Sequence, residues 1–205
     1  MMSAGCGSAP ERPPGPTPVP SAVSAGNIVR VRAALPAGYE TGDLAGPVSA
    51  AALWGFGAGW TADPPQCAAL ADPAPTDPAA RGLAASGPGG TVFVVAAVHP
   101  DPAPAAELMD QCQSWTMTFG HTRAEVTRDE GPGIAGARTA AWRAVATTVV
   151  ESGNATTSDA VTAVAFFDRH VAFVTLVTDP GSAHPPLDPG FAAALLTAAV
   201  AALRG

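Results

Sequence analysis

Histidine, serine and carboxylate side chains are the groups through which this sequence could do acid–base, nucleophilic or metal chemistry. The histidines are scattered, and none of them lies in the H-E-x-x-H pattern that holds zinc: His99, His121, His170 and His184. No serine occupies the G-x-S-x-G motif of a hydrolase. Glu107 and Asp110 are three residues apart, but on an amphipathic helix this spacing is typical of the solvent-exposed face. The sequence therefore predicts no catalytic residue and no metal ligand.

A glycine-rich stretch, Gly131–Gly136, matches the spacing G-x-G-x-x-G. In dinucleotide-binding folds that motif follows an apolar strand and opens a helix. Here the polar run Arg128–Glu130 precedes it and a strand-like pattern follows it. The chain also has no lysine, so it has no Walker A lysine. We therefore interpret the stretch as a turn between strands and expect no nucleotide cofactor.

The N-terminal segment has a composition unlike that of the remainder of the chain. Ser3–Cys6 resembles the end of a bacterial lipobox, in which the cysteine carries the lipid. The residues that follow, 7–26, are rich in proline, serine, glycine and alanine, which is typical of an extended spacer. We expect residues 1–26 to be a lipobox remnant with a disordered spacer and residues 27–205 to be a single domain. A chance Ala-Gly-Cys in an alanine-rich chain is the alternative.

Only Met1 and Met2 precede this motif, so the charged and apolar parts of an export signal are missing from the sequence as it stands. We therefore expect translation to start upstream of Met1. The remaining two of the three cysteines are Cys67 and Cys112, and an even pair in an exported protein favours a disulfide. Two buried free thiols are the alternative.

Hydrophobic periodicity predicts the elements that would position these residues. The alternation in residues 28–35 predicts a strand, and longer strand patterns follow within residues 82–99, 115–127, 138–150 and 159–178. Three Asp-Pro pairs, at residues 63–64, 101–102 and 188–189, each suit the start of a helix. We expect an α+β fold: an antiparallel sheet with about three helices packed on one face, and a bridge that ties the first helix to the second.

Large aromatic side chains are few in this alanine-rich chain. We consider Trp54, Trp60, Trp115 and Trp142 as candidate ligand-binding residues that line an apolar cleft between sheet and helices. Ordinary core packing is the alternative. A hydrophobic content of 47% excludes disorder for most of the chain. The net charge of −7 argues against a nucleic-acid partner, and no apolar run is long enough to span a bilayer.

Several short motifs together resemble a family of mycobacterial envelope lipoproteins of unknown function. They are Gly59-Trp60 before Pro65–Ala68, the run Gln111–Trp115, and the hairpin Phe166–Phe173. A more distant similarity is to the extracellular sensor domain of the PknH-type receptor kinase. The resemblance implies a disulfide between Cys67 and Cys112 and a lipid anchor at Cys6, and it supplies no catalytic residue.

These observations together suggest a non-enzymatic protein anchored by lipid on the outer side of the membrane. Its domain would bind an apolar small molecule, a lipid or a protein partner. Two alternatives remain: an exported enzyme whose site is assembled from scattered residues, and a structural interaction module. A buried carboxylate with a perturbed pKa beside a pocket would favour the enzyme.

Overall fold

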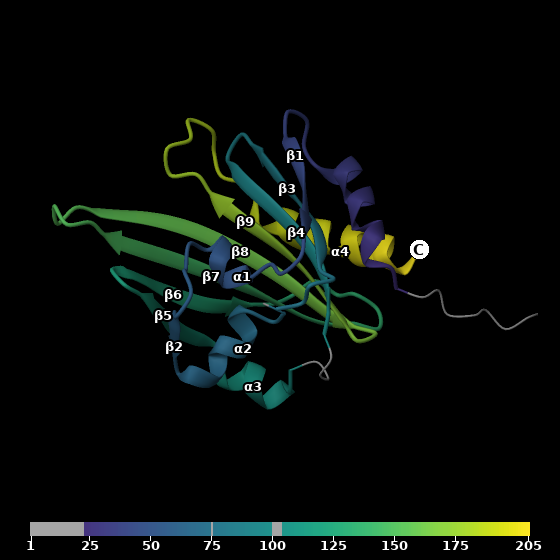
Figure 1. The fold of residues 1–205 in the computed structure, drawn as a ribbon, viewed down its shortest axis with the longest axis horizontal. Coiled ribbons are helices and arrows are strands. Elements are labelled where there is room, and N and C mark those ends of the chain that lie inside the picture. Colours follow the sequence, from purple (N-terminus) through teal and green to yellow (C-terminus); the bar gives the residue numbers. More distant parts are fainter. Residues whose placement is uncertain (1–22, 75, 100–103) are drawn as a thin grey trace, which may run out of the picture.

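The computed structural model describes residues 23–74, 76–99 and 104–205. Its centre is one antiparallel sheet of nine strands in the order β1-β3-β4-β9-β8-β7-β6-β5-β2 (Figure 1). The strands are β1 (Glu40–Ala45), β2 (Thr61–Asp63), β3 (Arg81–Gly87), β4 (Gly90–Val98), β5 (Ser114–Phe119), β6 (Thr122–Asp129), β7 (Arg138–Val149), β8 (Ala155–Phe167) and β9 (His170–Thr178). Hairpins join β3 to β4 and link β5 through β9 in succession, whereas β9 lies beside β4.

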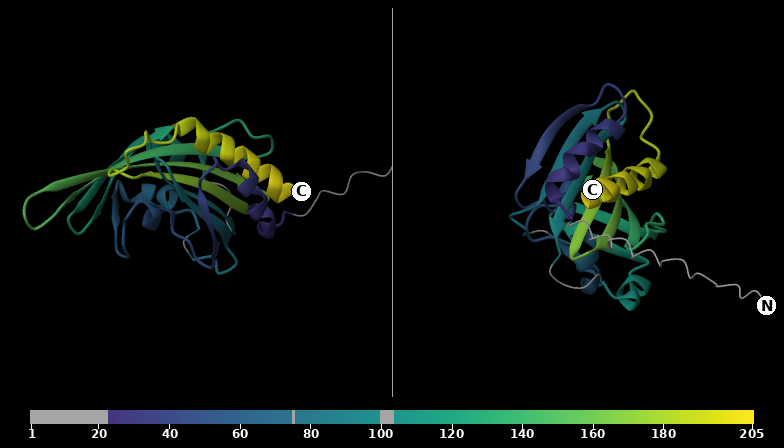
Figure 2. Two further views of the ribbon diagram at one scale, coloured as in Figure 1. Left: turned by 90° about the horizontal axis from the view of Figure 1, so that it is seen from above. Right: turned by 90° about the vertical axis from the view of Figure 1, so that its right-hand side faces the viewer.

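Two cores lie on opposite faces of this sheet. On one face, the C-terminal helix α4 (Pro189–Arg204) and the 3₁₀ helix η1 (Ala25–Ala34) cover strands β3, β4, β8 and β9. On the other face lie α1 (Ala50–Leu53), the 3₁₀ turn η2 (Pro65–Cys67), α2 (Ala68–Ala71) and α3 (Ala106–Gln111). Figure 2 (left) shows the sheet between these two layers. No helix within the described residues is long and apolar enough to cross a membrane.

The predicted α+β arrangement, with about three helices on one face and a helix–helix disulfide, is wrong. The protein is β-rich, and its short helical segments cover both faces of the sheet. Only the third Asp-Pro pair starts a full helix, where the Asp188 carboxylate accepts from the Gly190 N–H at 2.6 Å and Pro189 occupies the first turn. The first pair leads into η2 and α2, of three and four residues, and the second falls outside the described residues.

The strand predicted over residues 28–35 is also wrong: residues 28–34 belong to η1, and Leu35 follows its last residue. Their alternation is short, and the spacing that packing uses is three: Ile28 and Val31 are both buried against the sheet and α4, while Val29 is 41% exposed. A 3₁₀ helix has three residues per turn, so positions i and i+3 share a face. This helix leaves Val29 beside the free edge of the sheet.

Candidate functional site

The disulfide joins Cys67, the last residue of η2, to Cys112, the residue that follows α3. Both cysteines are fully buried in the core beneath α1, α2 and α3. These helices have only four to six residues each and cannot be stable on their own. The bridge therefore fastens two marginal segments to one another over this face of the sheet. It ties a 3₁₀ turn to a helix end, which corrects the predicted helix–helix geometry.

The tryptophans considered as ligand-binding residues belong to this same core. Trp54, Trp115 and Trp142 are each at most 4% exposed, and Trp60 is partly buried against them. The Trp54 indole N–H donates to the Thr162 hydroxyl at 2.9 Å, and Trp115 and Trp142 meet edge to face with centroids 6.3 Å apart. The described pockets are lined by other residues. The cleft that these aromatics would line therefore stays a prediction.

Among the described residues, no group of three or more His, Cys, Asp or Glu side chains could hold a metal ion. Glu107 and Asp110 are exposed on α3, as the spacing of a wet helix face indicates. The glycine motif Gly131–Gly136 lies in the connection between β6 and β7, with no helix after it. At Gly131 a Cβ would lie 2.5 Å from the Ala140 backbone nitrogen, so close packing of the loop on β7 explains that glycine.

Asp72 carries a partly buried carboxyl group with a perturbed pKa. Burial raises its pKa, against the opposing effect of hydrogen bonds from the Ser49 hydroxyl and the Ala50 N–H. These two donors lie at the start of α1, so the carboxylate accepts hydrogen bonds that the first turn would otherwise leave unmade. The described pockets are not lined by Asp72. Its geometry is that of a helix cap rather than of a catalytic acid.

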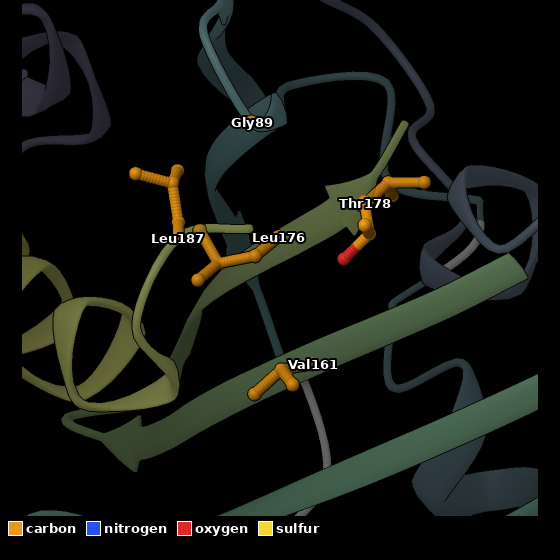
Figure 3. Close-up of a pocket in the computed structure, with 6 residues that line it drawn as sticks. Gly89, Val161, Leu176, Thr178 and Leu187 are labelled. Carbon is orange, nitrogen blue, oxygen red and sulfur yellow. The ribbon is translucent and has the colours of Figure 1, made fainter. Parts of the chain in front are cut away.

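Two of the described hollows offer little for a specific ligand. One, of about 20 Å³, lies between β8, β9 and the loop that carries Leu187 (Figure 3). Its lining is mainly aliphatic, with Val161 and Leu176 below Leu187, and the space suits a single water or methyl group. The other is a wide polar depression of about 360 Å³ beside Gln113 and Arg128. There, the Arg128 guanidinium is already engaged, because it donates to the Met109 carbonyl at 3.0 Å.

A third hollow lies at the free edge of the sheet, and we call it the η1–β1 groove. It has a volume of about 260 Å³. Its lining residues come from η1, β1 and β3: Gly26, Ile28, Val29, Asp43, Leu44, Ala45, Arg81 and Gly82. Figure 2 (right) shows η1 (purple) between α4 and the edge formed by β1 and β3. The groove is therefore walled by a helix on one side and by an edge strand on the other.

The η1–β1 groove is apolar in its middle and charged toward its rim. Val29 and Ala45 supply aliphatic surface over the buried side chain of Ile28. The Arg32 guanidinium forms an ion pair with Asp43, while Arg81 donates to the Ala80 carbonyl at 2.8 Å and forms no ion pair with a carboxylate of the described residues. Sequence reasoning missed this site, because none of its residues belongs to a motif.

The predicted lipid-bearing Cys6 and its spacer fall within residues 1–22, outside the residues that the structure describes. The described part begins where the chain meets α4: the Ser24 N–H donates to the Leu203 carbonyl at 3.0 Å. The hairpin tip of β7 and β8 lies at one end of the long axis of the molecule, and the C-terminus lies toward the other end (Figure 1). An anchor on Cys6 would thus attach at the end of the domain that holds the C-terminus.

Comparison with known families gives one match, to a family described as a domain of unknown function (DUF5642), over residues 24–204. No curated protein matches the chain. Among solved structures, an uncharacterised protein from Mycobacterium smegmatis, the Rv0999 ortholog, is 23% identical, with 89% of this chain and 98% of that chain covered and a TM-score of 0.67. This similarity establishes the fold alone.

The extracellular domain of PknH from Mycobacterium tuberculosis is similar at 16% identity, with 91% of this chain and 99% of that chain covered and a TM-score of 0.46. Together these findings confirm the predicted resemblance to a mycobacterial family of unknown function that is distantly similar to the PknH sensor.

Proposed function

The chain belongs to the DUF5642 family, and from that premise we propose that it is an exported binding protein without enzymatic activity. In this proposal a lipid on Cys6 holds it at the outer side of the membrane, and the η1–β1 groove is its binding site. The observation that carries the binding role is the groove itself, an open apolar trough beside a sheet edge that no other described element covers.

Export is supported by the buried disulfide. Structural disulfides form and persist in oxidising compartments and are rare in reducing ones. Cys67 and Cys112 are both fully buried, and their bond holds two helical segments that are too short to be stable alone. A protein that depends on such a bond folds best outside the reducing cytoplasm.

The lipid anchor is supported by sequence and by the position at which the described domain begins. Residues 7–22, which separate Cys6 from Val23, have the proline-rich composition of a spacer. In this proposal the tether joins the domain beside the end of α4, because the Ser24 N–H donates to the Leu203 carbonyl.

Fractionation of cells tests the anchor and the exported state together. The protein is expressed with a complete export signal in a mycobacterial host, as the parent and as Cys6→Ala. We expect the parent in the detergent phase, and the Cys6→Ala variant in the aqueous phase or the medium. Cys6→Ala has a matched control in Ser8→Ala, which changes the same segment and leaves the anchor. Partition of Cys6→Ala into detergent, or alkylation of Cys67 in unreduced cells, would contradict the proposal.

A further inference from the structure

We propose that the η1–β1 groove binds an extended strand of a partner protein, which adds to the sheet along the free edge of β1. This inference rests on the proposed binding role and names its ligand. It requires three features from the structure: unpaired backbone groups along one edge, an apolar trough for alternate side chains beside that edge, and charges that set the composition of the partner segment.

The edge itself is open over the whole of β1. All six residues of β1 pair with β3 on one side, from Glu40 opposite Ser86 to Ala45 opposite Arg81. In the described chain no strand pairs with the other side, because β1 is the first strand of the sheet. Alternate backbone N–H and C=O groups of β1 therefore point outward, and an added strand is the partner whose geometry matches that row.

The opposite edge of the sheet lacks this capacity. There β2 has only three residues, Thr61–Asp63, and Pro64 and Pro65 follow it at once. Proline has no N–H to donate and is a common means of blocking an edge. On β1 no proline lies between Glu40 and Ala45. At Gly42, in its middle, an added Cβ would meet nothing within 4 Å, so the sheet face opposite η1 is uncovered at this point.

The groove lies on the side of β1 where half of the side chains of an added strand would point. Asp43 and Ala45 share a face with Leu83 and Arg81, their partners on β3, and that face packs against η1. Side chains at every second position of an added strand would point to the same face. They would meet the exposed aliphatic side chain of Val29.

The size of the groove favours a peptide over a whole small molecule. Its volume of about 260 Å³ lies below the ~300–1,000 Å³ of pockets that enclose drug-sized ligands. It suits one or two aliphatic side chains whose backbone remains on the strand edge. The affinity would then come from main-chain hydrogen bonds and the selectivity from the trough.

Charge at the rim specifies the partner further. Charged side chains often protect edge strands, but on β1 the Asp43 carboxylate is paired with Arg32, and Glu40 lies at the far end on the other face of the sheet. Arg81 is exposed and forms no ion pair within the described part of the chain. An acidic side chain in the partner segment would meet it. The net charge of −7 opposes a second copy of this chain and favours a different protein.

Titration with a defined peptide, followed by amide NMR of the full chain, tests the inference. The probe is an eight-residue capped peptide in which valine alternates with threonine and one threonine near the end is replaced by aspartate. The matched probe carries N-methyl groups on its valines, which remove backbone donors and keep the side chains. With the first probe alone we expect shifts of the Thr41–Ala45 amides and slowed exchange of those among them that point away from β3.

Variants on the two walls of the groove complete the test. Val29→Glu should weaken binding of the peptide about tenfold or more, because it places a carboxylate in the apolar trough. Val149→Glu, at a valine of similar exposure at the far end of the molecule, should leave binding unchanged. Arg81→Glu should weaken binding about fivefold and should be rescued by a lysine in place of the peptide aspartate.

Binding that tolerates N-methylation or Val29→Glu would overturn the inference, as would the absence of any β1 shift at millimolar peptide. A fatty acid such as dodecanoate serves as the second ligand. If dodecanoate moves the groove resonances and the peptide does not, the strand inference fails while the binding role stands. If the chain dimerises with concentration and Val29→Glu abolishes the dimer, a second copy occupies the edge and the foreign partner is refuted.

Discussion

Removal of the disulfide by Cys67→Ala together with Cys112→Ala should destabilise the protein by about 4 kcal/mol. The bond joins residues 45 apart in sequence. The chain-entropy expression for a loop of that length gives about 13 cal/mol/K, or about 4 kcal/mol at 25 °C. For a domain of this size, each kcal/mol corresponds to a shift in melting temperature of roughly 2–4 °C, so we expect a fall of about 8–16 °C.

Equilibrium unfolding in urea, monitored by tryptophan fluorescence, measures this difference directly. Trp54, Trp115 and Trp142 lie in the same core as the bridge and report its loss. The parent is measured with and without a reducing agent, and the double variant serves as the matched control that the reductant should not affect. A loss below about 1 kcal/mol, or an equal effect of reductant on the double variant, would refute the reasoning that the bridge secures α2 and α3.

Three further variants test individual contacts. Trp54→Phe should lower the free energy of unfolding in urea by about 1 kcal/mol more than Trp115→Phe does. The first variant loses a hydrogen bond to Thr162, whereas the Trp115 indole N–H has no partner among the described residues. Equal losses would contradict this. The stability of Asp72→Asn relative to that of the parent should be highest at neutral pH, where the parent's partly buried carboxyl group is ionised. Since burial raises the folded-state pKa of Asp72, the parent should regain stability as the pH falls through that pKa toward 3.8; a constant difference between pH 7 and pH 3 would refute it. Gly82→Ala should cost about 2 kcal/mol or more in thermal unfolding, because its Cβ would lie 2.3 Å from the Val94 carbonyl oxygen, whereas Gly42→Ala meets open space and should be tolerated.

Local signals in the sequence correctly predicted the elements that carry them strongly. Asp188-Pro189 starts α4, and the apolar stripe of that helix is buried from Ala192 to Leu203. The strand pattern within residues 82–99 corresponds to β3 and β4, and Gly90–Ala96 of β4 is paired on both sides. In each case the secondary-structure signal and the apolar residues that are buried lie in the same short segment of sequence.

The predicted fold class was wrong because some elements are determined by tertiary contacts and not by a pattern in their own sequence. β1 reads ETGDLA and has no apolar alternation, because five of its six residues are exposed at the sheet edge. Its pairing with β3 supplies what its own sequence does not indicate. In η1, Ile28 and Val31 pack against α4 and the sheet, and this contact selects a 3₁₀ helix over the strand that the short alternation favours.

The η1–β1 groove escaped prediction for a related reason. Val29, Asp43 and Arg81 come from three separate elements, and no spacing in the sequence brings them together. Each residue type is ordinary on a protein surface. The site consists of an open edge and a shallow trough, and both exist only once β1 has paired with β3.

The central claim is that this is an exported, lipid-anchored binding protein, and native mass spectrometry of the protein purified from its own membranes tests it most directly. We predict a chain that starts at Cys6, is heavier by acyl groups and is lighter by the two hydrogens of the Cys67–Cys112 bond. A non-covalently bound polypeptide that dissociates from Val29→Glu would identify the occupant of the groove. An unmodified chain that starts at Met1 with three free thiols would contradict the account.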